Sequence, residues 1–544
     1  MEAAPERKVF TRQASGLVRN ARILDLAWFA LWTASPLVTN FFLVPLYAAL
    51  LPGADVRIAS LVGILLAVPV VVMYAALGSM MPRAGGDYLY ESRGLHPAVA
   101  MSVVMGWFIF LAIPTFLAGT LQSLATLGLA PIITLAGVLL NNSSLTASGG
   151  WFATSTGVFV VSVVALTIGL LHAMAGMTWV ARITRYVLIP IIVLSGIVIL
   201  VILGTTSAPA YVQSVNFYGS KLANDPNLYQ NVIQGAATAG FPTPAFSVVN
   251  TTIVAFILGA FFYYAVAAAP ILGEVKGANS LKNVFKAYVL AMVLVGFFFT
   301  FLEFILFYNV VGWDFTHASS IVGLFGLKTA TGNPLPFYPS FGFLTAMATT
   351  SLPLIVLASL GFIIIGYAQP MFNIFFVSRV LVSMSIDGLL PGWFSNINAR
   401  TRSPFNSLLF MFVVIVGTVA VFTFVPGGFF FVLGAALLTS QALIFVTSLS
   451  GLFFQWRRPE IHRASPVSKY RGLLPLASGL SLLVSGGVIY YYFTVPALGV
   501  AGSPGLTLLA VSFLIFLALY FVMRAYQKRK GIIVDLAARE IPPE

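Results

Sequence analysis

The sequence predicts an all-α integral membrane protein with twelve transmembrane helices, and its composition and its long apolar runs carry this prediction. Of the 544 residues, 59% are hydrophobic and only 8% are charged, whereas soluble domains carry about 25% charged residues. The apolar runs extend for about twenty residues or more, as membrane-spanning helices require, whereas strands of a membrane barrel alternate apolar and polar positions. We therefore expect the chain to lie in a lipid bilayer.

Twelve apolar segments are long enough to cross the bilayer. The first six are expected at residues 24–50, 58–77, 98–127, 152–172, 183–203 and 251–272. The other six are expected at residues 283–311, 343–382, 407–425, 429–450, 474–493 and 506–524. These spans divide the chain into an N-terminal segment (1–23), a first half (24–204), a loop (205–250), a second half (251–450), a part with the last two spans (451–524) and a tail (525–544).

The basic residues predict the orientation of these spans. All but three of the 28 lysines and arginines fall in the two terminal segments and in the loops that follow even-numbered spans. The exceptions are Arg57, Lys221 and Lys328. Because basic residues remain on the cytoplasmic side, we expect a multi-pass protein of the cell membrane with both termini in the cytoplasm and loop 205–250 outside. The net charge of +13 then marks one membrane face, and no nucleic-acid partner is expected.

Spans one and six contain small residues and prolines that interrupt a helical pattern. The interruptions are Ala34-Ser35-Pro36 in span one and Tyr263-Tyr264-Ala265, followed by Pro270, in span six. They lie five spans apart, as in transporters built from two inverted repeats of five helices. Exposed helix ends there would bind a carboxylate with free N–H groups and an ammonium group with free carbonyls. Two ordinary proline kinks are the alternative interpretation.

Few other polar side chains fall within the spans. Glu303 lies in span seven and Asp25 at the inner entrance of span one. Glu303 is either a proton carrier or a neutral group bonded to a neighbouring helix. In span eight, Gln369 and Asn373 are four residues apart and share a helical face, where they line a polar cavity or join helices. Trp107, with the two tyrosines of span six, either walls a pocket or packs between helices.

No pattern of catalytic groups accompanies these residues. The chain has no cysteine, which excludes disulfides and thiol chemistry. Its four histidines have no metal-ligand spacing, and no phosphate loop, Ser/His/Asp set or catalytic carboxylate pair is present. We therefore expect neither an enzyme nor a bound cofactor or metal.

Three loop segments and the chain end resemble the amino acid–polyamine–organocation permeases. The matching stretches are MPRAGGDYLY (81–90) followed by Leu95-His96-Pro97, GEVK (273–276), SRVL (378–381) with SIDGLLP (385–391), and EIPPE (540–544), which is similar to archaeal members. The resemblance implies a leucine-transporter-like fold, in which a five-plus-five inverted repeat with discontinuous helices 1 and 6 is followed by two further helices. It also implies secondary transport of an amino acid or related amine, bound at the two interruptions.

The chain departs from this family at positions that affect substrate and coupling ion. The interruption in span one is usually rich in glycine, so the side chains of Ala34, Ser35 and Tyr264 are expected to narrow the pocket. Where some members bind sodium through a pair of hydroxyl residues in span eight, this chain has Ala368 and Gln369. Span five also lacks the lysine of some proton-coupled members. We expect proton coupling rather than sodium coupling.

Together these observations predict ion-coupled uptake of an amino acid by alternating access. Because we find no acidic residue near the two interruptions in the sequence, we expect a neutral substrate rather than a cationic one. Arg19 or Arg22 is expected to pair with Asp387 and close the inner side, although these are otherwise solvated loop charges. The alternatives are an exchanger or exporter of amino acids or amines, and a membrane sensor that binds an amino acid without transporting it. The oligomeric state stays open.

Overall fold

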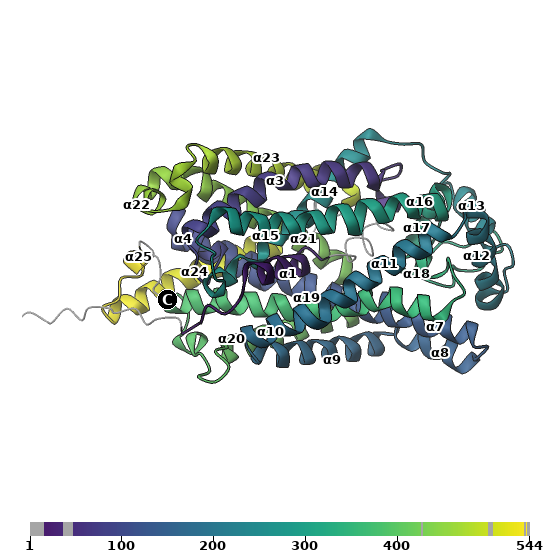
Figure 1. Cartoon of the computed structure of the whole chain (residues 1–544), viewed down its shortest axis with the longest axis horizontal. Helices are drawn as coiled ribbons and strands as arrows, with labels where there is room; N and C mark the ends of the chain where they lie inside the picture. Colours follow the sequence, from purple (N-terminus) through teal and green to yellow (C-terminus); the bar gives the residue numbers. More distant parts are fainter. Residues whose placement is uncertain (1–15, 36–46, 426–427, 499–503, 538–539, 541–544) are drawn as a thin grey trace, which may run out of the picture.

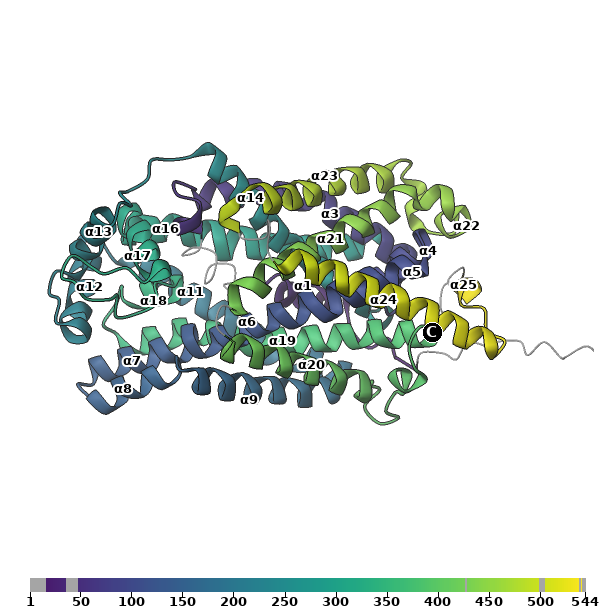
Figure 2. The ribbon, with the colours of Figure 1, turned by 180° about the vertical axis from the view of Figure 1, so that it is seen from behind.

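The structure, a computed structural model, describes residues 16–35, 47–425, 428–498, 504–537 and 540. Regular structure in this part of the chain consists of helices, apart from two isolated β-bridges, Ala21–Val275 and Lys328–Pro334. Most of the long helices run along the longest dimension of the molecule (Figures 1 and 2). The predicted all-helical class is confirmed.

Eleven helical runs within the described residues are long and apolar enough to cross a membrane. They are α3 (Val56–Met80), α5 to α7 (Pro97–Leu139), α9 (Ser155–Met174), α10 to α11 (Met177–Thr205), α14 with η4 (Val248–Glu274), α15 to α16 (Leu281–Val311), α19 (Leu352–Ile386), α20 (Phe405–Phe424), α21 (Gly428–Arg457), α23 (Leu473–Thr494) and α24 (Pro504–Arg529). Each corresponds to one predicted span. The chain is thus a multi-pass membrane protein.

Predicted span one begins with the shorter apolar helix α1 (Ile23–Thr33). This α-helix ends where the interruption was predicted: Ala34 caps it, and Ser35 has a φ of +55°. The left-handed region costs a residue with a side chain about 1–2 kcal/mol, and the α region is disfavoured before a proline. Pro36 itself lies outside the described residues.

Short helices cover the two ends of the bundle (Figure 1). At one end lie α4 (Asp87–Gly94), α22 (Pro459–Arg463) and α25 (Val534–Ala537); we call this the α4 end. At the other, which we call the α12 end, lie α8 (Ser143–Trp151), α12 (Ala208–Ala223), α13 (Leu228–Thr238) and α17 (Trp313–Phe325). The segments predicted to be cytoplasmic after spans two and ten therefore lie at one end with the described part of the tail.

Two predicted spans differ in extent from the observed helices. The third helix continues to Leu139 instead of ending at 127, through two π-helical stretches, η1 (Met101–Ala112) and η2 (Leu124–Leu129). The predicted span 343–382 is divided into α18 (Phe341–Ala346) and α19, because the polar stretch 349–351 ends one helix and Pro353 begins the next. Loop 205–250 also contains two helices, α12 and α13, that were not expected.

The inner part of the bundle positions the two interrupted helices beside each other. Helix α1 packs against η4 (Tyr264–Glu274), α15 (Leu281–Val293) and α19. The helix before η4, α14 (Val248–Tyr263), packs along α3, and the two backbones approach closely at Gly63 and Gly259. Small residues permit such close approach between membrane helices.

Candidate functional site

The two interruptions face each other in the middle of the bundle. In predicted span six the α-helix ends at Tyr263, and the chain continues as the 3-10 helix η4, which contains Pro270. A 3-10 stretch of this length is unusual, and such stretches often mark a functional hinge. The hydroxyl of Thr33, which donates to Ala30 O (2.9 Å), also lies 3.5 Å from the carbonyl oxygen of Ala265 in η4.

Gln369 connects the interruption in α1 to two other helices. Its amide N–H donates to the hydroxyl of Ser35, and its Oε1 accepts a hydrogen bond of 2.6 Å from Thr120 Oγ1. All three side chains are buried. Ser35 is at the end of α1, Thr120 lies in α6 (Ile113–Ser123) and Gln369 in α19. The site therefore combines a left-handed backbone position with neutral polar groups that both donate and accept hydrogen bonds.

The other predicted substrate residues lie at different distances from this cluster. Tyr263 is buried and donates its hydroxyl hydrogen to Gln441 Oε1 of α21. Tyr264 stacks on Phe116 of α6, with ring centroids 6.1 Å apart. Trp107 instead contacts α24, where its indole N–H donates to Leu509 O at 3.0 Å. The structure does not bring Trp107 into the cluster around Gln369.

Two polar residues predicted within the spans are buried: Asn373, expected to line a polar cavity or join helices, and Glu303, expected to carry a proton or bond to a neighbouring helix. The Asn373 amide donates to the backbone oxygen of Gln369 one turn earlier, at 2.9 Å. Glu303 is 1% exposed and begins α16 (Glu303–Val311). The burial and contacts of Asn373 and Glu303 are compatible with helix packing as well as with a part in coupling, so a part in coupling stays a prediction for both residues.

Buried ion pairs close the α4 end beneath the interruptions. Asp387 contacts Arg93 of α4 at 2.6 Å and accepts a hydrogen bond of 2.6 Å from Tyr88. Arg379 of α19 contacts Glu274 at the end of η4 at 2.7 Å. Because Arg93, Asp387, Arg379 and Glu274 are at most 1% exposed, these four side chains are shielded from solvent.

The segment before α1 is also fixed to η4. The Ala21 N–H donates to Glu274 O at 3.0 Å, and the Lys276 N–H donates to Ala21 O at 2.9 Å. Asp25 pairs with Arg185 at 2.5 Å and accepts the backbone N–H of Arg22 at 2.8 Å.

The ion pair found on Asp387 thus comes from Arg93, whereas Arg19 or Arg22 was expected. Arg19 is half-buried and Arg22 is exposed. A role of either arginine in closing the inner side stays a prediction.

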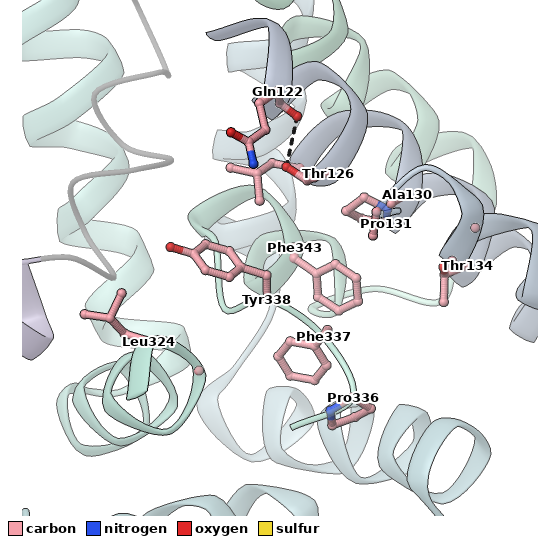
Figure 3. A pocket seen from close by; sticks show the side chains of 15 residues that line it. Gln122, Thr126, Ala130, Pro131, Thr134, Leu324, Pro336, Phe337, Tyr338 and Phe343 are labelled. Carbon is pink, nitrogen blue, oxygen red and sulfur yellow. Dashed lines mark hydrogen bonds between the residues drawn. The ribbon is translucent and has the colours of Figure 1, made fainter. Parts of the chain in front are cut away.

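A cavity of about 570 Å³ opens toward the α12 end. Figure 3 shows Gln122 and Thr126 from the helical run of α6 and η2 on one side, facing Tyr338 and Phe343. The Oε1 atom of Gln122 is buried and accepts no hydrogen bond from the described residues. Thr120, which binds Gln369, lies in the same run. The larger cavity therefore lies toward the α12 end, and a smaller one of about 350 Å³ is lined by Asn20, Glu274 and Arg402 among others.

Sequence reasoning missed a second polar cluster next to η4. Asp87 of α4 accepts hydrogen bonds from Tyr74 and, at 3.0 Å, from Thr447 Oγ1, which also lies 3.0 Å from Glu91 Oε1. A cavity of about 10 Å³ is lined by Asp87 together with Tyr264 of η4. The expectation that no acidic residue lies near the interruptions is therefore wrong. The spacing of Asp87 and Glu91, four residues apart on one helical face, was the signal available in the sequence.

The chain matches a family model described as amino acid permease over residues 26–524. The matched region contains most of α1 and the whole of η4, α19 and both polar clusters. No curated protein sequence matches the chain.

Proposed function

Because the chain belongs to the amino acid permease family, we propose that it is a secondary active transporter that takes up a neutral amino acid together with protons. In this proposal it lies in the cell membrane with the α4 end and both termini in the cytoplasm, as the distribution of lysines and arginines favours. The halves 24–204 and 251–450 act as inverted repeats that move around a substrate held between α1, η4 and α19.

The observation that carries this proposal is the cluster of Ser35, Gln369 and Thr120 at the end of α1. Its side chains are uncharged and buried, and helix ends in general carry backbone groups without partners in their own helix. An amino acid presents a carboxylate and an ammonium group, which such N–H and carbonyl groups bind. The substrate side chain then meets uncharged groups, which supports a neutral amino acid. Asp87 does not alter this choice, since its carboxylate is engaged by Tyr74 and Thr447.

The two ends of the molecule differ, with a large cavity toward the α12 end and buried ion pairs toward the α4 end, and this difference supports alternating access. In this proposal the cavity between Gln122 and Phe343 is the entrance from the α12 end, and the pairs Arg93–Asp387 and Arg379–Glu274 hold the α4 end closed. Transport then requires the ion pairs to separate as the outer cavity closes. Binding of substrate must favour this rearrangement, because a ligand shifts an equilibrium only through different affinities for the two states.

Proton coupling is the preferred source of energy in this proposal. Ala368 and Gln369 lie where some members of the resembled family have the hydroxyl residues of a sodium site in span eight. The Gln369 amide is already bonded to Ser35 and Thr120. Asp87 and Glu91 of α4 are carboxyl groups that can bind a proton, and Asp87 lines a small cavity together with Tyr264 of η4.

Uptake by the purified protein in liposomes tests the proposal. Labelled neutral, cationic and acidic amino acids are compared under an imposed proton gradient, an imposed sodium gradient and no gradient. We expect a neutral amino acid to accumulate only with the proton gradient. Accumulation driven by sodium alone, uptake that requires internal amino acid, or binding without uptake would each contradict the proposal and indicate sodium coupling, exchange or sensing.

A further inference from the structure

A pair of buried carboxyl groups between α3, α4 and α21 has been given no defined step in the function proposed so far. Asp87 is 5% exposed and Glu91 is 0% exposed. Burying a carboxylate is costly unless a cation or several hydrogen bonds compensate it. Among the described residues, the ion pairs include none with either carboxyl.

The hydrogen bonds of Thr447 constrain the protonation of the pair. Its hydroxyl oxygen lies 3.0 Å from Asp87 Oδ1 and 3.0 Å from Glu91 Oε1. A hydroxyl has a single hydrogen to donate, so it can donate to only one of these carboxyl oxygens. The contact of the hydroxyl with the second carboxyl is favourable when this second carboxyl is protonated, because it then donates a hydrogen bond to the hydroxyl oxygen. The geometry therefore fits one proton shared by the two acids.

Glu91 has a further atom available for a proton. Its Oε2 is buried and accepts no hydrogen bond from the part of the chain that the structure describes. Burial raises the pKa of Asp87, and burial together with the charge of Asp87 raises the pKa of Glu91 well above its ordinary value. Like charges at one site disfavour ionisation of both groups.

Among the described residues, several titratable side chains surround the pair, and no ion pair joins a cation to Asp87 or Glu91. The groups around it are Tyr74 from α3, Tyr90 in α4, Tyr264 from η4 and Tyr288 from α15. Arg93 in α4 pairs with Asp387 of α19, and His96 before α5 faces Tyr520 of α24. A proton is therefore the cation that this pair can bind without rearrangement.

The pair is also connected to the interrupted helix. Asp87 shares the cavity of about 10 Å³ with Tyr264, Val266 and Ala267 of η4, a volume that holds roughly one water molecule. The loop before α4 contacts η4 directly: the Gly85 N–H donates to Pro270 O at 3.3 Å, and a Cβ at Gly86 would lie 2.9 Å from Pro270. A change of charge at Asp87 and Glu91 thus acts on η4 over a short distance.

We propose that Asp87 and Glu91 together hold one exchangeable proton and form the site through which proton binding is coupled to movement of η4 and hence to transport. This inference rests on the proposed function and names its coupling residues. When the proton is released, the O–H bond of one carboxyl breaks, the proton passes to water at the α4 end, and the electron pair stays on the carboxylate oxygen. The resulting pair of negative charges then favours a different arrangement of α4 and η4.

Glu91→Gln in the full chain, reconstituted in liposomes, tests this site. Two readouts are compared: accumulation driven by a gradient of one pH unit, and exchange of internal for external amino acid without a gradient. One coupled proton supports about tenfold accumulation per pH unit. We expect the unaltered protein to approach this value and Glu91→Gln to lose accumulation while it retains exchange. Glu460→Gln, at a glutamate whose side chain is 60% exposed, is the matched control and should behave as the unaltered protein.

The outcomes separate the site from the function. If the unaltered protein shows no accumulation in the proton gradient, the proposed function fails, and the coupling role fails with it. If the unaltered protein and Glu91→Gln accumulate substrate equally, only the site is wrong. If Glu91→Gln also loses exchange, Thr447→Val decides, because it retains both carboxyls. A shifted pH midpoint of its uptake supports the shared proton, and an unchanged midpoint overturns it.

Discussion

At the scale of single residues, Gln369 is the side chain on which the candidate substrate site depends most. We expect Gln369→Leu to lower the affinity for the transported amino acid about fivefold, since one hydrogen bond contributes about 1 kcal/mol and 1.4 kcal/mol corresponds to a factor of ten. The affinity is measured from exchange at increasing substrate concentration. Gln213→Leu, at an exposed position of α12, is the control. An unchanged affinity in Gln369→Leu would remove this residue from the site.

Glu91 gives a second prediction at this scale, which concerns stability rather than transport. Because burial raises its pKa in the folded protein above the ordinary value of 4.5, the folded state binds the proton more tightly than the unfolded state. The stabilisation of the folded state by this tighter proton binding is therefore complete below pH 4.5, and it is lost as the pH rises through the pKa of Glu91 in the folded protein. Thermal unfolding of the purified protein should show this decline, and Glu91→Gln should flatten it. An equal decline in both proteins would mean that Glu91 is not its source.

The sequence indicated some of these residues and not others, for physical reasons. Ser35 was recognised because it precedes Pro36, and Gln369 because an amide is rare in an apolar helix. The contact of Gln369 with Thr120 was not predictable, because it joins positions 249 residues apart through tertiary packing. Trp107 illustrates the opposite case: aromatic character alone suggested a pocket, whereas the indole N–H is bonded to α24.

At the scale of helices, the close approach of α3 and α14 predicts opposite effects for two glycines. A Cβ at Gly63 would lie 2.9 Å from the Gly259 nitrogen, whereas a Cβ at Gly417 in α20 would meet nothing within 4 Å. Gly63→Ala should therefore lower the thermal stability, because it pushes α3 away from α14. Gly417→Ala should leave stability unchanged or raise it by up to about 1 kcal/mol, since alanine favours helices over glycine. Equal effects in thermal unfolding would show that the two helices adjust without cost.

Helix positions were largely predictable because a bilayer imposes a minimum apolar length. Predicted span 58–77 corresponds to α3, and span 474–493 to α23. The two larger errors have different causes. The third helix continues past residue 127 to Leu139, because the apolar run itself extends to residue 140. The predicted span 343–382 is divided before Leu352, where the polar residues 349–351 interrupt the apolar run.

At the scale of the whole molecule, the buried ion pair Arg93–Asp387 is expected to hold the α4 end closed. Asp387→Asn leaves Arg93 without its carboxylate partner, and breaking a buried pair in this way costs about 3–5 kcal/mol. The cost falls on the closed state alone if the pair separates during transport, so the open state becomes more populated. We therefore expect more access from the α4 end to the residues of η4.

The absence of cysteine from the chain makes this change measurable at one position. A single reporter, Ala267→Cys, lies in η4 beside the small cavity. A maleimide that does not cross membranes is applied from the α4 end, and Asp387→Asn should increase its labelling rate. The double variant Arg93→Met with Asp387→Leu tests the cause, because hydrophobic replacement of a buried pair often preserves stability. If attraction between the two charges closes this end, labelling rises in Asp387→Asn and in the double variant alike. If the cost of an unpaired Arg93 opens it, labelling rises in Asp387→Asn and stays low in the double variant. If labelling is unchanged in Asp387→Asn, the pair is a packing contact and the closure lies elsewhere.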